Sequence, residues 1–287
     1  LFKRTGLIEI GPPDGEVVPG VLRAAQEHGL DVEPLDVAQL TRRFPGFLVP
    51  EGMVGVYEAD GGVLNVEACV EAHAALAQDR GATLLTGTGV LGWRPDGDGV
   101  LIETTSGPVR AGALIVTAGA WAPDLLGTIG LPLQVKRKVL LWYPLLAPPA
   151  AQCPVDEGGV AFLYELPEGI YYGLPSMDGA TLKVACHDAG VYIDDPLALD
   201  RALHGTDHEA VDRFLAACMP GVQPHSPRRH AVCMYTMTPD RHMVIDQVPG
   251  PANAWYAAGL SGHGFKYANA LGEALVQLTL DGDCAVD

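Results

Sequence analysis

A strand, a tight turn and a helix follow one another in the stretch AWYAAGLSGHGFKYANALGEALVQLTL, residues 254–280. Apolar and aromatic residues fill positions 254–258, which is typical of a buried strand. The glycines of GLSGHG then predict a tight turn. The helix expected over residues 265–280 has a buried face formed by Ala268, Leu271, Leu275 and Leu278. This order indicates an α/β arrangement.

The turn GLSGHG also has a functional interpretation. The N–H groups at the start of a helix lack intrahelical partners, and the helix dipole makes this end positive. Such an end suits an anion or an electron-rich carbonyl. The alternative is an ordinary turn that carries a surface His263 and Lys266, and the turn alone does not decide between the two.

The region before residue 130 repeats the α/β pattern. Asn65 is expected to cap a helix that ends at Gly81, with apolar residues at helical spacing. Strands are expected over residues 82–85, 100–104, 109–110 and 113–117, and a helix begins near Trp121.

The remaining segments favour an antiparallel sheet with few helices. Residues 5–10 resemble a strand, and helices are expected over residues 15–29, 36–44 and 208–218. Short aromatic strands separated by Pro and Gly fill most of residues 131–239. We therefore predict an α/β plus α+β fold with two domains. The first is discontinuous, residues 57–130 and 240–287, and the second comprises residues 1–56 and 131–239.

Composition excludes several classes of function. The 287 residues carry a formal charge of −17, which disfavours binding to nucleic acid. No apolar run is long enough to span a bilayer, so no membrane partner is expected. The six cysteines are far apart with no CxxC pair, which favours reduced thiols in a cytoplasmic protein. No His/Cys cluster has the spacing of a metal site, so no metal is expected.

One glycine motif is misleading. GTGVLG, residues 87–92, formally matches the dinucleotide fingerprint GxGxxG. That fingerprint needs a helix directly after it, whereas Trp93 to Gly97 read as a turn and Pro95 blocks a helix. Chance glycines explain the match better.

Four other stretches place chemistry-bearing residues in a fixed order. They are LIVTAGAWAPDLL (114–126), GIYYGLPSMDGATLKVACH (169–187), HAVCMYTMTPDRHMVID (230–246) and AAGLSGHGFKYANALGE (257–273). Together they closely resemble the family of monomeric sarcosine oxidases and N-methyltryptophan oxidases, within the D-amino-acid-oxidase-like flavoproteins. The resemblance covers nearly the whole chain. It implies that the α/β domain binds FAD in a Rossmann-like fold and that the inserted sheet domain binds substrate.

The resemblance implies that two residues act directly on the cofactor. Cys233 looks like the cysteine whose sulfur is bonded covalently to the flavin, although a lone Cys is usually a small buried hydrophobe. Lys183 looks like the lysine that activates dioxygen, since a cation stabilises the negative charge that dioxygen acquires. Without the resemblance, Lys183 would be read as a solvated residue on a strand.

The same resemblance implies a substrate pocket and a cofactor cradle. His187, His263, Tyr172 and Tyr235 match the polar pocket, and Lys266 matches a cation that holds the substrate carboxylate. A lysine so near a helix N-terminus is disfavoured by the dipole, as a functional site predicts. Further cofactor contacts are expected from Val90, Ala118, Gly119, Trp121, Met234, Gly259, Gly262, His263, Gly264, Phe265 and Lys266.

The implied activity is oxidation of a small secondary N-methyl amino acid to an imine, which hydrolyses to formaldehyde, while dioxygen is reduced to hydrogen peroxide. Pipecolate or N-methyltryptophan are alternative substrates. The family's first βαβ unit and its carboxylate-binding arginine are not in the sequence, so a fragment of a longer protein is expected. An inactive fragment that lacks the ADP-binding module is the remaining alternative. Family members of this type are typically monomeric.

Overall fold

The computed structural model describes residues 1–146, 158–250 and 253–285, and it divides the chain into two compact units. Unit 1 comprises Leu1–Asn65, Lys138–Gly190 and Asp200–Cys233. Unit 2 comprises Val66–Arg137, Val191–Leu199 and Met234–Asp287.

Unit 1 is built on a mainly antiparallel sheet. Its strands follow the order β10-β13-β12-β11-β2-β4-β3. Their bounds are β2 Leu7–Gly11, β3 Glu33–Leu35, β4 Val54–Glu58, β10 Gln134–Pro144, β11 Ala161–Leu166, β12 Gly169–Leu174 and β13 Thr181–Cys186. Strand β15 (Arg229–Met237) also pairs with β10, and β2 pairs with β11 in parallel. A separate two-stranded sheet joins β1 (Phe2–Arg4) to β5 (Gly62–Leu64).

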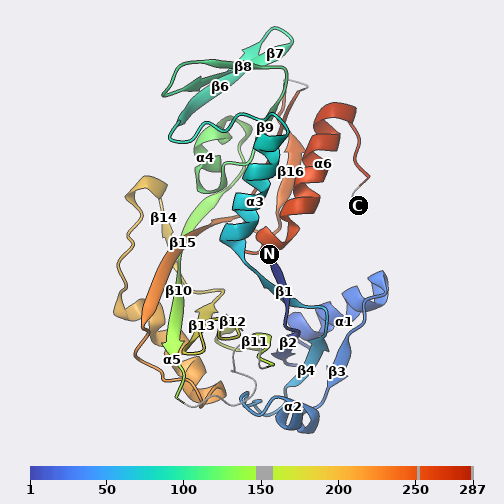
Figure 1. The fold of residues 1–287 in the computed structure, drawn as a ribbon, viewed down its shortest axis with the longest axis vertical. Coiled ribbons are helices and arrows are strands. Elements are labelled where there is room, and N and C mark those ends of the chain that lie inside the picture. Colours follow the sequence, from blue (N-terminus) through green and yellow to red (C-terminus); the bar gives the residue numbers. More distant parts are fainter. Residues whose placement is uncertain (147–157, 251–252, 286–287) are drawn as a thin grey trace. The chain divides into compact units, whose positions relative to one another are not determined.

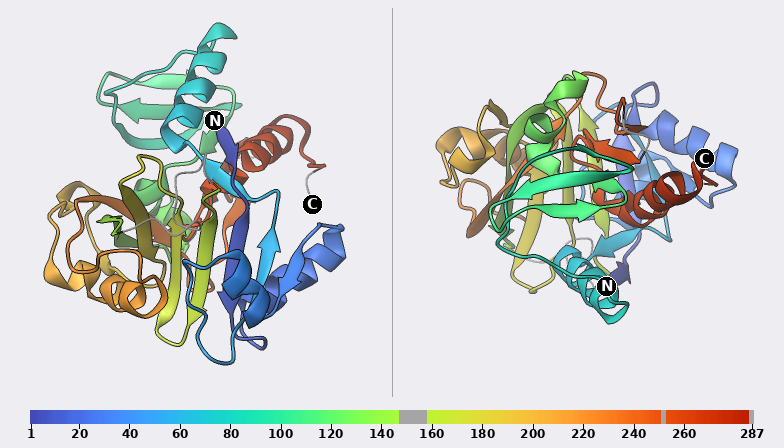
Figure 2. Two further views of the ribbon diagram at one scale, coloured as in Figure 1. Left: turned by 60° about the horizontal axis from the view of Figure 1, so that its bottom comes forward. Right: turned by 90° about the horizontal axis from the view of Figure 1, so that it is seen from above.

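Three helices accompany the sheet of unit 1. They are α1 (Val17–His28), α2 (Val37–Arg43) and α5 (Gly205–Cys218). Helix α1 lies along β2 and β4, as Figure 2 shows. Helix α5 contacts β13, and its buried Phe214 stacks on Tyr171 of β12 with ring centroids 4.6 Å apart. Phe162 and Tyr164 are buried in the same hydrophobic core, together with many aliphatic side chains.

Unit 2 contains two small sheets. One has the order β16-β17-β9, with β16 Val244–Gln247, β17 Ala254–Ala258 and β9 Leu114–Val116. Strands β17 and β9 are parallel, and helix α6 (Ala268–Asp281) packs on both of them (Figure 1). The other sheet is the antiparallel meander β6-β7-β8, with β6 Val90–Asp96, β7 Gly99–Thr104 and β8 Val109–Ala111.

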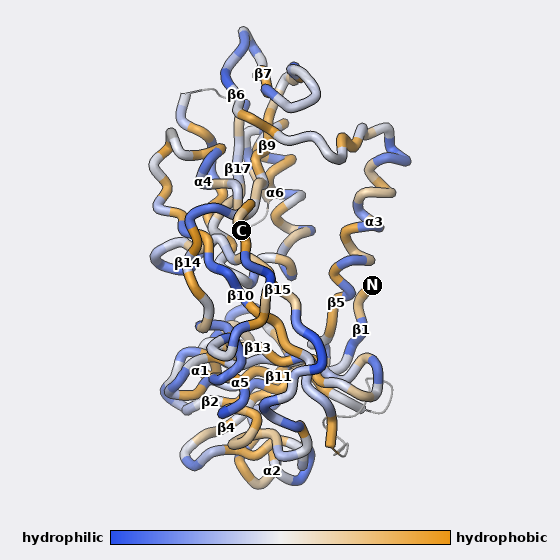
Figure 3. Tube along the Cα trace, turned by 90° about the vertical axis from the view of Figure 1, so that its left-hand side faces the viewer, coloured by the Kyte–Doolittle hydropathy of each residue, from blue (hydrophilic) through white to orange (hydrophobic). Residues whose placement is uncertain are grey.

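The shorter elements complete unit 2. They are α3 (Val66–Asp79), α4 (Ala122–Leu125), β14 (Val191–Ile193) and the 3-10 helices η1 (Gly119–Trp121), η2 (Gly127–Ile129), η5 (Pro196–Ala198) and η6 (Phe265–Tyr267). Helix α3 carries hydrophobic and hydrophilic residues along its length, as Figure 3 shows, and Cys69 is its buried residue.

The structure corrects four expectations for unit 2. Residues 82–85 form no strand, and the meander instead begins with β6. Trp93 to Asp96, expected to form a turn, belong to β6. Pro95 is tolerated there because β6 is an edge strand, which has one side without ladder hydrogen bonds. Strand β9 does not belong to the meander, since its partner is β17. Ala268 is exposed, whereas Ala274 and Leu275 are the buried residues of α6.

Two of the five boundaries between the units lie inside strands. The chain passes from unit 2 to unit 1 after Arg137 of β10, and from unit 1 to unit 2 after Cys233 of β15. The sequence places the corresponding limits at residues 131 and 240, where Pro and Gly signal turns. A strand that continues through a boundary carries no such signal.

Candidate functional site

The residues singled out from the sequence lie in both units. Unit 1 holds Tyr172, Lys183, His187 and Cys233. Unit 2 holds Val90, Ala118, Gly119, Trp121, Met234, Tyr235, Gly259, Gly262, His263, Gly264, Phe265 and Lys266. The two groups are therefore considered one at a time.

Lys183 in unit 1 lies over an aromatic ring. It pairs with Trp142 across strands β13 and β10, and its Nζ is 5.5 Å from the centroid of the indole. The guanidinium of Arg229, at the start of β15, lies 4.0 Å from the same centroid. Both cations interact with the electron-rich ring. Trp142 and Arg229 were not anticipated from the sequence, because each gives an ordinary strand signal.

Cys233 lies within the electrostatic influence of two lysines. Its thiol is half-buried on β15. Burial raises the pKa of the Cys233 thiol, and the positive charges of Lys138 and Lys183 act in the opposite direction. The structure thus brings the sulfur of Cys233 and the ammonium of Lys183 into one neighbourhood of unit 1.

Tyr172 lies on β12, and His187 directly follows the carboxyl end of β13. Tyr172 is the register partner of Ala185, two residues before His187. The amide of His187 donates to the carbonyl of Ile170 at 2.6 Å. Both side chains are half-buried, so each combines partial shielding from solvent with access to it.

The glycine turn of unit 2 closes against Tyr235. Gly262 has φ +89°, and a Cβ there would lie 2.1 Å from a ring carbon of Tyr235. Ser261 in this turn is buried and has φ 49°. Its amide donates to the carbonyl of Thr236 and its hydroxyl donates to the carbonyl of Gly259, both at 2.9 Å, and these hydrogen bonds stabilise the turn. Glycine at 262 therefore permits a close approach that other residues would prevent.

His263 and Lys266 lie together on the turn and the short helix η6. The Nζ of Lys266 donates to the carbonyl of His263 at 3.2 Å and lies 5.2 Å from the ring centroid of Tyr267. Desolvation lowers the pKa of His263, and the charges of Lys266 and His242 lower it further. His263 is therefore kept in its neutral form, which can accept a proton.

Two of the predicted stretches follow the carboxyl ends of neighbouring parallel strands. Strands β9 and β17 are parallel, with Val116 opposite Tyr256. Ala118, Gly119 and Trp121 follow the carboxyl end of β9, and the glycine turn follows the carboxyl end of β17. Ligands of open α/β sheets bind at the carboxyl ends of the strands. Val90 lies elsewhere, on β6, where it pairs with Thr104.

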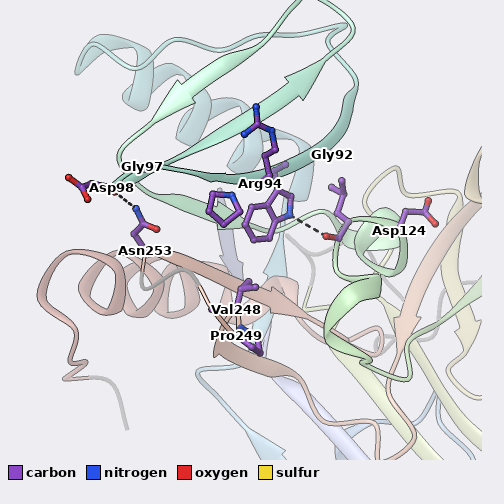
Figure 4. A pocket seen from close by; sticks show the side chains of 13 residues that line it. Gly92, Arg94, Gly97, Asp98, Asp124, Val248, Pro249 and Asn253 are labelled. Carbon is purple, nitrogen blue, oxygen red and sulfur yellow. Dashed lines mark hydrogen bonds between the residues drawn. The ribbon is translucent and has the colours of Figure 1, made fainter.

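A cavity of about 990 Å³ in unit 2 lies at the opposite end of these strands. Residues 92–95, 97–99, 124–125, 248–250 and Asn253 line it (Figure 4). The indole N–H of Trp93 donates to the carbonyl of Leu125 at 3.2 Å, and the amide of Asn253 donates to the carbonyl of Asp98 at 2.8 Å. None of the residues predicted to bind cofactor or substrate lines this cavity.

The described residues also bear on metals, membranes and disulfides. Within residues 1–146, 158–250 and 253–285, no three His, Cys, Asp or Glu side chains gather so as to hold a metal ion. The same ranges contain no helix long and apolar enough to cross a membrane. No disulfide joins the five cysteines in this part of the chain, and Cys153 lies outside the described residues.

Comparison with known proteins identifies the family. A family model described as FAD dependent oxidoreductase matches residues 1–278. The chain belongs to this family. The predicted family and the predicted class of enzyme, a flavin-dependent oxidoreductase, are confirmed.

Two curated members of the family match almost all of the chain. Monomeric sarcosine oxidase from Bacillus sp. (strain B-0618) is 39% identical over 286 residues, which cover 98% of this chain and 72% of the relative. N-methyl-L-tryptophan oxidase from Citrobacter koseri is 35% identical over 275 residues, which cover 95% of this chain and 72% of the relative.

Solved structures share the fold. NikD, an unusual amino acid oxidase essential for nikkomycin biosynthesis, superposes in its open form with a TM-score of 0.81 at 23% identity, covering all of this chain and 76% of its own. L-proline dehydrogenase from P. horikoshii has a TM-score of 0.82 at 20% identity and the same complete coverage of this chain, with 75% of its own. These structures confirm the predicted fold class.

The chemistry of the side chains fits a flavin. Unit 1 offers a thiol under the influence of two ammonium groups, and a cation suits a cofactor that becomes negative when reduced. Unit 2 offers two backbone turns at the carboxyl ends of parallel strands, where backbone N–H groups bind nucleotides. Each unit therefore offers groups of a type that can hold a flavin.

Proposed function

We propose that this FAD-dependent oxidoreductase oxidises a small secondary N-methyl amino acid of the sarcosine type to an imine, which water hydrolyses to formaldehyde and an amine. The observation that carries this proposal is the 39% identity to a monomeric sarcosine oxidase over 98% of the chain. The common electrostatic neighbourhood of Cys233 and Lys183 in unit 1 supports it from the structure.

Several residues would hold the cofactor. Cys233 is the proposed point of covalent attachment, with Met234 beside it. The turn after β9 would supply Ala118, Gly119 and Trp121, and β6 would supply Val90. The turn after β17 would supply backbone contacts from Gly259, Gly262, His263, Gly264, Phe265 and Lys266. When bound, a flavin would accept two electrons as a hydride equivalent from the C–H bond next to the amine nitrogen, which leaves a C=N bond once the nitrogen has lost its proton, and would pass them with two protons to dioxygen to give hydrogen peroxide.

The substrate would be held by charge and by neutral polar groups. Lys266 would bind the carboxylate, as a cation pairs with an anion in a partly desolvated place. His263 is kept neutral by desolvation and nearby charge, so it suits the task of accepting a proton from the amine. His187, Tyr172 and Tyr235 would complete the polar pocket.

Lys183 would serve the oxygen half-reaction. A fixed ammonium stabilises the negative charge that dioxygen acquires, without reorganisation of solvent. The contact of Lys183 with Trp142 supports this role, because it restricts the ammonium to one side of the sheet.

A bulkier substrate is the second candidate. The 35% identity to an N-methyl-L-tryptophan oxidase favours it, since that relative also matches 95% of the chain. Pipecolate is a further alternative of the same chemistry. Comparison of kcat/KM for sarcosine, N-methyltryptophan and pipecolate, with hydrogen peroxide as the product measured, separates these candidates.

Acid denaturation of the full-length protein tests the attachment. We expect a yellow pellet from which the colour cannot be washed, a colourless pellet for Cys233→Ser, and a yellow one for the control Cys284→Ser. Colour that washes away from the parent protein refutes attachment at Cys233. A panel of N-methyl amino acids that yields no peroxide from yellow protein refutes the activity and favours an inactive fragment.

Two further proposals concern the state of the protein. The similarity to a monomeric sarcosine oxidase supports a monomer. A cytoplasmic location is supported by the wide spacing of the cysteines, which suits reduced thiols.

A further inference from the structure

Lys138 is a buried cation that binds the backbone directly after β13. Only 1% of its surface is exposed. Its Nζ donates to the carbonyl oxygens of Cys186 at 2.8 Å and His187 at 2.7 Å, and also to the carbonyl of Ala189. A buried ammonium needs such oxygens, because desolvation of a charge is costly. Three carbonyls of one short turn therefore converge on a single nitrogen.

This contact fixes His187 from a second side. The amide of His187 is already bound to the carbonyl of Ile170, and its own carbonyl is bound to Lys138. The turn is tied further by Asp188, whose carboxylate accepts from the amide of Ile170 at 2.7 Å. With both peptide groups of His187 bound, the direction of its Cα–Cβ bond is set by the sheet rather than by a mobile loop.

The charge of Lys138 reaches a second group in unit 1, because β10, which carries Lys138, pairs with β15, which carries Cys233. It opposes the effect of burial on the pKa of the Cys233 thiol, and it is the larger of the two cationic influences, the other being Lys183. A thiol reacts as its thiolate, which a nearby cation favours. Three carbonyl acceptors require the three N–H groups of an ammonium, so Lys138 is charged, and this charge acts on Cys233.

We propose that Lys138 is a positioning residue of the flavin site, which fixes the backbone of His187 and maintains positive charge on the strand that pairs with the strand of Cys233. This inference rests on the proposed function, because it gives Lys138 its purpose through two residues assigned there. Lys138 touches neither substrate nor cofactor in this role and acts only through His187 and Cys233.

The pH dependence of Cys233 alkylation tests the electrostatic half. The full chain is produced in riboflavin-starved cells, so that the thiol is free to react, and modification by iodoacetamide is followed by mass spectrometry of the Cys233 peptide. In folded Lys138→Met and Lys138→Gln, we expect the midpoint of the profile to rise and alkylation at neutral pH to slow by about tenfold, because loss of the cation disfavours the thiolate. Lys136→Met, two residues earlier on β10, should match the parent. An unchanged profile in either folded variant overturns this half.

Hydrogen exchange tests the positioning half. Amides of residues 186–190 should exchange faster in Lys138→Met, and less so in Lys138→Gln, whose amide can still donate. Equal protection in parent and Met variant overturns this half. If the Met variant does not fold, the Gln variant decides both halves. It has no charge and only two N–H donors in place of three, so an unchanged alkylation profile overturns the first half, and protection of residues 186–190 equal to that of the parent overturns the second. Failure of the proposed function is distinguishable: Cys233 would then be unmodified in protein grown with riboflavin, whereas the alkylation profile would still report on Lys138.

Discussion

Lys183 and Trp142 are register partners on β13 and β10, and the ammonium lies 5.5 Å from the centroid of the indole. A cation over an aromatic face gains about 0.5–2 kcal/mol, depending on how far it is desolvated. This contact gives Lys183 a defined position in a sheet, where a long side chain would otherwise sample many rotamers. The role proposed for Lys183 needs such a fixed charge.

The first prediction concerns Lys183→Met in the flavin-loaded protein. Reoxidation by dioxygen should slow by about a hundredfold or more, because a preorganised charge at the developing anion is lost. Anaerobic reduction by substrate should change little. Stopped-flow absorbance of the flavin measures both steps, and Lys136→Met is the control. An unchanged oxygen rate would remove Lys183 from the reaction.

The second prediction concerns the pKa of His263. Desolvation lowers this pKa, and the charges of Lys266 and His242 add to the effect. Lys266→Met should therefore raise the pKa of His263, which NMR titration of its imidazole protons measures. Because the pKa in the folded state lies below the unfolded value of about 6.5, the neutral imidazole favours folding at higher pH. Stability should fall as the pH drops below about 6.5, and by less in the variant.

Lys136→Met again serves as the control, since Lys136 is not among the groups that act on His263. A His263 pKa that is the same in the parent and in Lys266→Met would show that the ammonium does not influence the imidazole. The low pKa of His263 would then depend on desolvation and on His242.

The third prediction compares two glycines of the same region. Gly262→Ala should destabilise the protein by about 1–3 kcal/mol, because φ is +89° and the new Cβ would meet the ring of Tyr235. Gly272→Ala, in helix α6 with nothing within 4 Å of the new Cβ, should be neutral or stabilising by up to about 1 kcal/mol. Urea denaturation measures both changes. Equal effects of the two substitutions would contradict the close approach of Tyr235.

The strand, turn and helix of residues 254–280 show which features can be predicted from a sequence. Residues 254–258 were predicted as a strand with the bounds that the structure gives to β17. Apolar residues bounded by a glycine turn make such a strand evident locally. The helix was expected from residue 265, but η6 precedes α6, because the first turn is tightened into a 3-10 helix.

Other features depend on partners that a sequence does not display. Pro95 read as a helix-blocking turn, and only the edge position of β6 makes it compatible with a strand. Lys138 stands in the run Lys136-Arg137-Lys138, which reads as solvated, although three carbonyls from residues 186–189 bury it. The site residues themselves were found through the resemblance, and their roles stay predictions.

The last prediction concerns a buried carboxylate in helix α5. Asp212 is 2% exposed and accepts hydrogen bonds from the hydroxyl of Tyr143 at 2.8 Å and the amide of His225 at 2.9 Å, and its other oxygen lies 2.6 Å from Nδ1 of His208. Burial alone would raise the pKa of Asp212, but these hydrogen bonds lower it on balance. The carboxylate therefore favours folding in its ionised form.

Asp212→Ala should lower the free energy of unfolding by about 3 kcal/mol at neutral pH, because buried donors lose their acceptor. In the parent, this contribution should be complete above the unfolded pKa of about 3.9 and lost as the pH falls through the lower folded value. The matched control is Asp200→Ala, since Asp200 and His204 form the same i,i+4 pair at 2.6 Å but are more than half exposed. It should cost less than about 1 kcal/mol. Urea denaturation across this pH range measures both, and equal costs would show that burial of the Asp212 pair adds nothing.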